Sequence, residues 1–303
     1  MEIAVGTERG MWQQRQSDAH VAESIAPNIS LFAVADGFGE CGKHASAAPL
    51  ALATMRDYLR RRQRVGSFAR SLTPSGLRAI LLAALDYANA RLFSQSGSHD
   101  DFVGSGTSLT AVMVAGHHAF VGHVGDGRAY LLRLGHLDVL TADDAMFAGT
   151  TVTHAKPALP ARPNARRLLW RSLGSQAKLE ASIAHVELLA GDQLALCTDG
   201  VHRCVDDDEL RDSLAESASA AEVVTRVLST AKARGNADNG TLIVARDLLA
   251  ASSAELVARG RRLGARSLVV ALLLALSVVS VGAYVLRSGF TGHSASYSSS
   301  ETP

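Results

Sequence analysis

The amino-acid sequence predicts a mixed α and β domain over residues 1–246, followed by one membrane-spanning helix. Three observations support this fold class: short apolar runs that end in Asp–Gly, an apolar stripe at helical spacing, and a 20-residue uncharged segment at 267–286. Hydrophobic residues make up 47% of the chain and charged residues 19%, which favours a globular domain over a disordered one. The formal net charge of +1 argues against a general nucleic-acid binder.

Several segments have the composition of strands. Residues 30–35 form an apolar run that ends at Asp36–Gly37, which indicates a buried strand leading into a tight loop. Four further segments are separated by glycine-containing turns and predict a meander of successive strands: 107–115, 119–124, 128–133 and 137–141. Residues 194–198 and 241–245 complete the predicted strands.

Helices are predicted in three places. Thr73 and Pro74 favour a helix start, and a stripe of apolar residues follows at helical spacing: Leu77, Ile80, Leu81, Ala84, Leu85, Ala88 and Leu92. Residues 206–215 and 220–234 also have helical patterns. Residues 142–164 favour neither helix nor strand and contain three prolines, which is typical of a mobile loop.

The uncharged segment 267–286 is long enough to cross a membrane. As a helix rising about 1.5 Å per residue it would span about 30 Å, the thickness of a hydrocarbon core. A buried core helix is the alternative. Four arginines precede the segment and only Arg287 follows, so we expect the N-terminal domain to be cytoplasmic and the protein to be single-pass. Residues 247–266 then form a juxtamembrane linker, and 287–303 a short extracytoplasmic tail.

Aspartates recur at the ends of the predicted strands. Asp36, Asp126 and Asp199 each precede a glycine, Asp238 precedes Asn239–Gly240, and Asp18 stands before another strand. A single Asp–Gly pair is adequately explained as a turn. Repeated carboxylates at one rim of a sheet would repel each other and require a cation, and oxygen ligands favour Mg²⁺ or Mn²⁺. The spacing alone leaves both explanations open.

The order of the motifs resembles the protein phosphatase 2C family of metal-dependent phosphatases. Five blocks match in sequence across residues 6–246: RGMWQQRQSDA, LFAVADGFG, GSGTSLTAV with HVGDGRAYLLRLG, GDQLALCTDGV and DNGTLIV. Each block alone is a weak signal, but five in order are specific.

The resemblance implies two antiparallel sheets packed as a sandwich and flanked by helices, in α-β-β-α layers. It also implies two Mn²⁺ or Mg²⁺ ions that activate a water molecule to hydrolyse phosphoserine and phosphothreonine. Asp36 is expected to bridge the ions, Gly37 to offer its carbonyl, Asp199 and Asp238 to hold the second ion, and Asp18 to act through water. Asp126 matches a residue that helps to bind a weaker third ion.

The chain departs from the family pattern in its first motif. Gln13 replaces the arginine that grips the substrate phosphate, and Ser17 replaces a glutamate. Arg15, two residues on, would share a face with position 13 on a strand and is the predicted substitute; a solvated surface arginine is the alternative. Phe38, Gly127 and Arg203 also differ from residues common in the family. These departures motivate a second hypothesis, a catalytically weak phosphatase-like module that senses or docks a phosphoprotein.

Other chemistries have less support in the sequence. Cys41 lacks the CX5R pattern of thiol phosphatases because residue 47 is alanine. The histidines show no spacing typical of zinc ligands. The family resemblance implies phosphoproteins as partners, with Ser/Thr kinases and their substrates among them, and the apolar segment implies a membrane reached through one helix.

Overall fold

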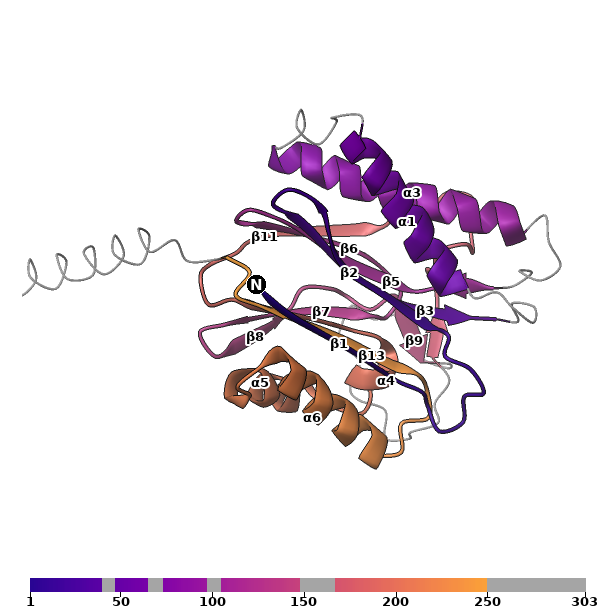
Figure 1. Cartoon of the computed structure of the whole chain (residues 1–303). Helices are drawn as coiled ribbons and strands as arrows, with labels where there is room; N and C mark the ends of the chain where they lie inside the picture. The colour runs from indigo at the N-terminus through magenta and orange to yellow at the C-terminus, as the bar shows by residue number, and fades with distance from the viewer. Residues whose placement is uncertain (40–46, 65–72, 97–104, 148–166, 250–303) are drawn as a thin grey trace, which may run out of the picture. The chain divides into compact units, whose positions relative to one another are not determined.

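The computed structural model describes residues 1–39, 47–64, 73–96, 105–147 and 167–249. They form two large antiparallel sheets with helices on both outer faces, and a small third sheet of two strands (Figure 1). The helices are α1 (Ala47–Arg64), α3 (Pro74–Ser96), α4 (Asp199–His202), α5 (Asp207–Glu216) and α6 (Ala220–Ala233). The strands are β1 (Glu2–Glu8), β2 (Asp18–Ala26), β3 (Ile29–Phe38), β4 (Gly106–Thr107), β5 (Leu109–Ala115), β6 (His118–Val124), β7 (Arg128–Arg133), β8 (His136–Val139), β9 (Ala145–Phe147), β10 (Arg167–Leu169), β11 (Ser182–Glu187), β12 (Gln193–Cys197) and β13 (Gly240–Arg246).

The two sheets form the inner layers of a four-layer domain. One sheet has the order β1-β13-β12-β7-β8, and the other has the order β11-β6-β5-β3-β2, with β4 paired to β3. Helices α1 and α3 pack on the second sheet, whereas α5 and α6 cover the first (Figure 1). The predicted layered sandwich is confirmed for this part of the chain.

Alternation along the central strands explains why the sheets stack. On β3, Phe32 and Val34 belong to the core between the sheets, while Leu31 and Ala33 face the helices. Because successive side chains of a strand point to opposite faces, a strand covered on both faces must be apolar throughout. The even-numbered face of β3 ends in Asp36, which places that carboxyl at the end of the core between the sheets.

The predicted meander is wrong in one connection. β5 pairs with β6 and β7 pairs with β8, but β6 and β7 belong to different sheets. The chain changes sheet at Gly125, whose φ of +105° favours glycine, and a Cβ there would lie 2.5 Å from Ser108 Cβ. This crossing leaves Asp126 in the turn at the end of the sandwich.

The predicted helices are confirmed with small shifts in their ends. All seven residues of the stripe on α3 are buried, and Thr73 Oγ1 accepts a hydrogen bond from Gly76 N at 3.2 Å. Helix α5 begins with a capping box in which Asp206 and Glu209 satisfy each other's backbone N–H groups. Helix α6 ends one residue earlier than predicted.

Several strands differ from the sequence predictions. β3 continues through Asp36 and Gly37, so these residues lie in a strand rather than in a loop. β9 falls inside the segment predicted to be irregular, and β1 and β11 were not predicted. Residues 148–164 of that segment lie outside the described residues, as do the predicted membrane span and its tail. Within the described residues, no helix is long and apolar enough to cross a membrane.

Candidate metal centre

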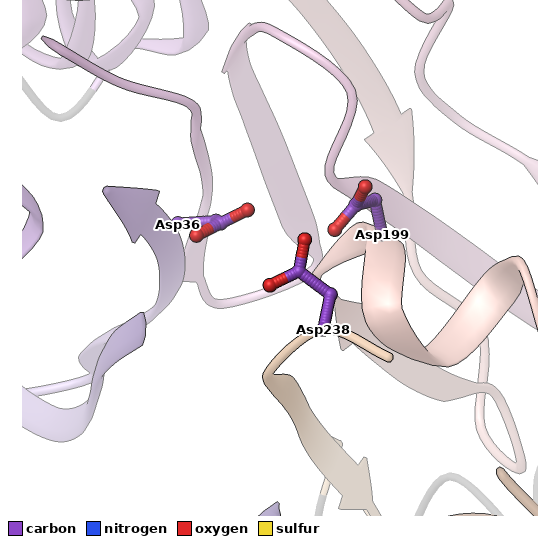
Figure 2. A group of neighbouring side chains, drawn as sticks. All are labelled: Asp36, Asp199 and Asp238. Carbon is purple, nitrogen blue, oxygen red and sulfur yellow. The ribbon is translucent and has the colours of Figure 1, made fainter. Parts of the chain in front are cut away.

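Three carboxylates from separate parts of the chain converge at one end of the sandwich. Single oxygens of Asp36, Asp199 and Asp238 all lie within 4.8 Å of one another. Figure 2 shows the three side chains pointing into the same space. Asp36 comes from β3, Asp199 from the first residue of α4, and Asp238 from the loop before β13.

Close backbone packing brings Asp199 and Asp238 together. Asp199 was predicted to lie in an Asp–Gly turn, but it begins the short helix α4. A Cβ on Gly200 would lie 2.0 Å from the carbonyl oxygen of Asn239, so only glycine lets α4 approach the loop that carries Asp238. The glycine of this motif therefore sets the distance between two carboxylates.

Asp18 lies directly opposite Asp36 on the neighbouring strand. The two residues are register partners in the β2–β3 pair. Like charges in such a pair destabilise a sheet unless something compensates them. Burial raises the pKa of Asp18 to about 6, although Thr241 and Thr198 donate hydrogen bonds of 2.8 and 2.9 Å to its Oδ2.

Asp36 is held in a position that disfavours its charged form. Burial, reinforced by the neighbouring charges of the other aspartates, raises its pKa well above the ordinary value. Its backbone is fixed: Thr107 Oγ1 and Ser108 N donate to its carbonyl oxygen at 2.8 and 2.9 Å. Because the site holds this carboxyl in place despite the repulsion, it is suited to a positively charged ligand.

Several donors already contact the carboxylate group, and two of them are long polar side chains. Gln13 Nε2 donates to Asp238 Oδ1 at 2.8 Å, across 225 positions of sequence. Arg203 Nη1 lies 3.2 Å from Asp199 Oδ2, and its side chain is 33% exposed. The guanidinium supplies one positive charge against several carboxylates, so the group remains electronegative.

The remaining predicted residues lie around this group. Gly37 is on β3 and pairs with Thr107. Asp126 is buried in the turn between β6 and β7, and its charge contributes to the raised pKa of Asp36. It is outside the three-carboxylate group, and its carbonyl oxygen lies 2.8 Å from His202 Nε2.

Arg15 is placed differently from the prediction. It is exposed and precedes β2, so the strand-face argument that related it to position 13 does not hold. Its carbonyl oxygen accepts a hydrogen bond from Asn239 Nδ2 at 3.0 Å, which ties this loop to the loop carrying Asp238. The prediction that its guanidinium binds substrate phosphate remains a prediction.

Sequence reasoning missed the residues that hold the carboxylates in place. Asn239 Oδ1 accepts from Gly10 N at 3.2 Å, and its Nδ2 donates to Ser17 Oγ at 2.8 Å. Thr198 and Thr241 connect the two sheets through Asp18. The position of Asn239 immediately after Asp238 was a usable signal. Gln13 was noted only as the replacement of an arginine, and nothing in the sequence indicated the role of the threonines.

The donor set fits divalent cations. Its members are carboxylate oxygens, which favour hard ions such as Mg²⁺ and Mn²⁺, and their mutual repulsion is what a bound cation would offset. Cys197, two residues before Asp199, is fully buried, and burial raises the pKa of its thiol to about 12. A thiol this difficult to ionise is a poor nucleophile or metal ligand.

Comparison with known proteins identifies the family. A model described as protein phosphatase 2C matches residues 5–252. The chain therefore belongs to the protein phosphatase 2C family, and the resemblance read from its motifs is confirmed.

Curated relatives carry matching names. The serine/threonine protein phosphatase PstP of Mycobacterium tuberculosis is 30% identical over 248 residues, covering 81% of this chain and 45% of that protein. This chain thus matches about half the length of that relative. A serine/threonine phosphatase stp of Listeria monocytogenes is 28% identical over 250 residues, covering 82% of this chain and 97% of that protein.

Solved structures agree with the fold. The catalytic domain of PstP, in complex with two manganese ions, superposes with a TM-score of 0.66 at 30% identity, over 81% of this chain and 97% of that one. The phosphatase MsPP from Mycobacterium smegmatis, in complex with cacodylate, gives a TM-score of 0.60 at 28% identity, over 80% and 97%.

Proposed function

We propose that this chain hydrolyses phosphoserine and phosphothreonine in proteins, using two Mn²⁺ or Mg²⁺ ions. The observation that supports this most directly is the convergence of Asp36, Asp199 and Asp238 within 4.8 Å. The family membership and the names of the relatives point to the same reaction.

Asp36, Asp199 and Asp238 would hold the cations, with Gly37 offering its carbonyl and Asp18 acting through water. Asp126 would contribute to a weaker third ion. When bound, the cations would stabilise the negative charge on the phosphoryl oxygens and would lower the pKa of a water molecule, so that no side-chain nucleophile would be needed. The chain's own contribution is position: Gln13 orients Asp238, Arg203 orients Asp199, and Thr198 with Thr241 keeps one oxygen of Asp18 fixed.

The second hypothesis is a catalytically weak module that binds a phosphoprotein. It is favoured by Gln13 and Ser17, which stand where the family carries an arginine and a glutamate. Groups around a metal centre typically change metal affinity or activity about 10–100-fold. The three carboxylates of the centre, which are retained, favour the enzyme.

One experiment separates the two hypotheses. The purified chain is supplied with Mn²⁺ and with matched peptides that carry phosphothreonine, phosphoserine or phosphotyrosine. We expect metal-dependent phosphate release from the first two, and little from the third. Binding of the phosphothreonine peptide without turnover would favour the docking module. A protein that neither binds the peptide nor releases phosphate would reject both hypotheses.

We further propose that the protein is held at a membrane by residues 267–286, with the catalytic domain in the cytoplasm. The uncharged length of this segment and the arginines at 259, 261, 262 and 266 support the span and its orientation. Membrane-associated phosphoproteins, including Ser/Thr kinases and their substrates, would then be accessible partners. A reporter active only outside the cytoplasm should give signal when fused after Pro303 and none at Ala250; the reverse pattern would reject this orientation.

A further inference from the structure

An exposed apolar pair lies beside the carboxylate centre. Met11 and Trp12 are 68% and 74% exposed, and Trp12 is one of only two tryptophans in the chain. Tryptophan is usually well buried, and surface tryptophans are enriched where proteins bind partners. The proposed reaction uses neither side chain.

The pair forms the tip of a turn that is clamped to the site. Gln13 N donates to Gly10 O at 3.1 Å, which closes a four-residue turn with Met11 and Trp12 in its centre. At one end Gly10 packs so closely that a Cβ would lie 2.4 Å from the carbonyl carbon of Asp238. At the other end Gln13 Nε2 bonds Asp238 itself at 2.8 Å.

The turn is also fixed from the side. Met11 N donates to the carbonyl oxygen of Asn236 at 3.0 Å, and Gly10 N donates to Asn239 Oδ1 at 3.2 Å. The loop of residues 236–239 therefore holds both the candidate metal ligand and the base of the turn. A rigid backbone that presents exposed apolar side chains has little ordering entropy to lose when it binds a partner.

We propose that Trp12, supported by Met11, is a specificity-determining residue that docks a large apolar side chain of the substrate near its phosphorylated residue. The inference rests on the proposed phosphatase function. Trp12 is the neighbour of Gln13, which contacts Asp238, and neighbouring Cα atoms are about 3.8 Å apart, so the turn lies within a few residues' reach of the carboxylates. An extended peptide advances about 3.3 Å per residue, so a side chain within about three residues of the phosphoresidue can reach the turn.

The test uses a panel of phosphothreonine peptides with one leucine at each position from −3 to +3 in an alanine and serine background. A small chromogenic phosphate ester, p-nitrophenyl phosphate, reports turnover without a peptide. For the wild-type protein we expect kcat/KM to be about tenfold higher for at least one leucine peptide than for the all-alanine peptide. We define a ratio as the kcat/KM for that leucine peptide divided by the kcat/KM for the small ester. This ratio should fall about tenfold in Trp12→Ala and should be largely restored in Trp12→Phe.

The matched control is Leu134→Ala. Leu134 is 99% exposed and follows β7 at the end remote from Asp126, so the substitution removes exposed apolar surface away from the site. This variant should keep the wild-type ratio. A Trp12→Ala ratio within about twofold of wild type, or an equal loss in Leu134→Ala, would overturn the inference.

Binding separates this inference from the proposed function. If the wild-type protein releases no phosphate from any substrate, the phosphatase proposal fails, and calorimetric titration with the leucine peptide that binds the wild-type protein most tightly still tests the turn. A Kd about tenfold weaker in Trp12→Ala than in Leu134→Ala supports docking at Trp12. Equal affinities, or no binding by the wild-type protein, reject it.

Discussion

At the residue scale, the account depends on carboxylates that the fold holds together against their repulsion. Asp36, Asp199 and Asp238 share one space, and Asp18 stands opposite Asp36 on the next strand. An ordinary folded domain gains nothing from such a group. Their joint placement is explained if cations complete the site.

Replacing any of the three central carboxylates by asparagine should reduce metal-dependent phosphate release by at least about 100-fold, since each removes a charged ligand. Asparagine has nearly the same shape as aspartate, so the circular dichroism spectra of Asp36→Asn, Asp199→Asn and Asp238→Asn should remain those of the wild type. Asp208→Asn, in an exposed residue on α5, is the matched control. Wild-type turnover in any of the three variants at matched metal would reject the assignment.

Arg15 provides a separate test of how phosphate is held. Charge-assisted hydrogen bonds from its guanidinium to a phosphate dianion would be worth ~1.5–3 kcal/mol, so Arg15→Ala should lower kcat/KM for a phosphopeptide roughly 10–150-fold. Metal affinity, measured by calorimetry, should barely change.

Arg9→Ala removes another exposed arginine from the same loop and should have a smaller effect. If Arg15→Ala stays within about twofold of wild type, Arg15 is a surface charge and the cations hold the phosphate without it.

At the element scale, the sequence predicted the elements more reliably than the connections between them. The stripe on α3 identified a helix because its seven apolar residues repeat at the helical period and all become buried. The meander failed at Gly125, because a turn between paired strands and a crossing between sheets both favour glycine. The hydrogen bond between Gln13 and Asp238 joins residues 225 positions apart, and no local sequence pattern predicts it.

The contact between α4 and the loop before β13 makes an element-scale prediction. Gly200→Ala would place a Cβ 2.0 Å from Asn239 O, so α4 must shift, at a cost of about 1–3 kcal/mol in the free energy of unfolding. Asp199 moves with α4, so Mn²⁺ affinity should fall in the same variant.

Gly116→Ala is the control for Gly200→Ala, because its φ of +57° costs stability while no atom lies within 4 Å of the added Cβ. It should lower the melting temperature without changing Mn²⁺ affinity. Unchanged Mn²⁺ affinity in Gly200→Ala would show that this contact does not position Asp199.

At the scale of the whole molecule, the raised pKa values predict how stability depends on pH. Burial raises the pKa of Asp18 from 3.8 to about 6, and burial together with the neighbouring carboxylates raises the pKa of Asp36 well above its ordinary value, so the folded metal-free domain binds more protons than the unfolded chain. The contribution of these groups to stability is therefore lost as the pH rises from about 4 through their folded pKa values. A bound cation offsets this loss by favouring the ionised forms.

The increase in melting temperature produced by Mn²⁺, relative to EDTA, should accordingly be larger at pH 7.5 than at pH 5.5. Differential scanning calorimetry of the same preparation at both pH values checks this, and Asp18→Asn should reduce the difference. A metal-induced increase that is equal at the two pH values, or larger at pH 5.5, would contradict the electrostatic account.

The central claim is that the carboxylate group is a two-cation phosphatase site. It is tested most directly by titrating Mn²⁺ calorimetrically into the metal-free chain and measuring phosphate release from a phosphothreonine peptide at each point. The account predicts two ions bound per chain, no release in EDTA, and release that rises with occupancy of the site. Release that persists without a divalent cation, or a fully loaded protein that releases no phosphate, would contradict it.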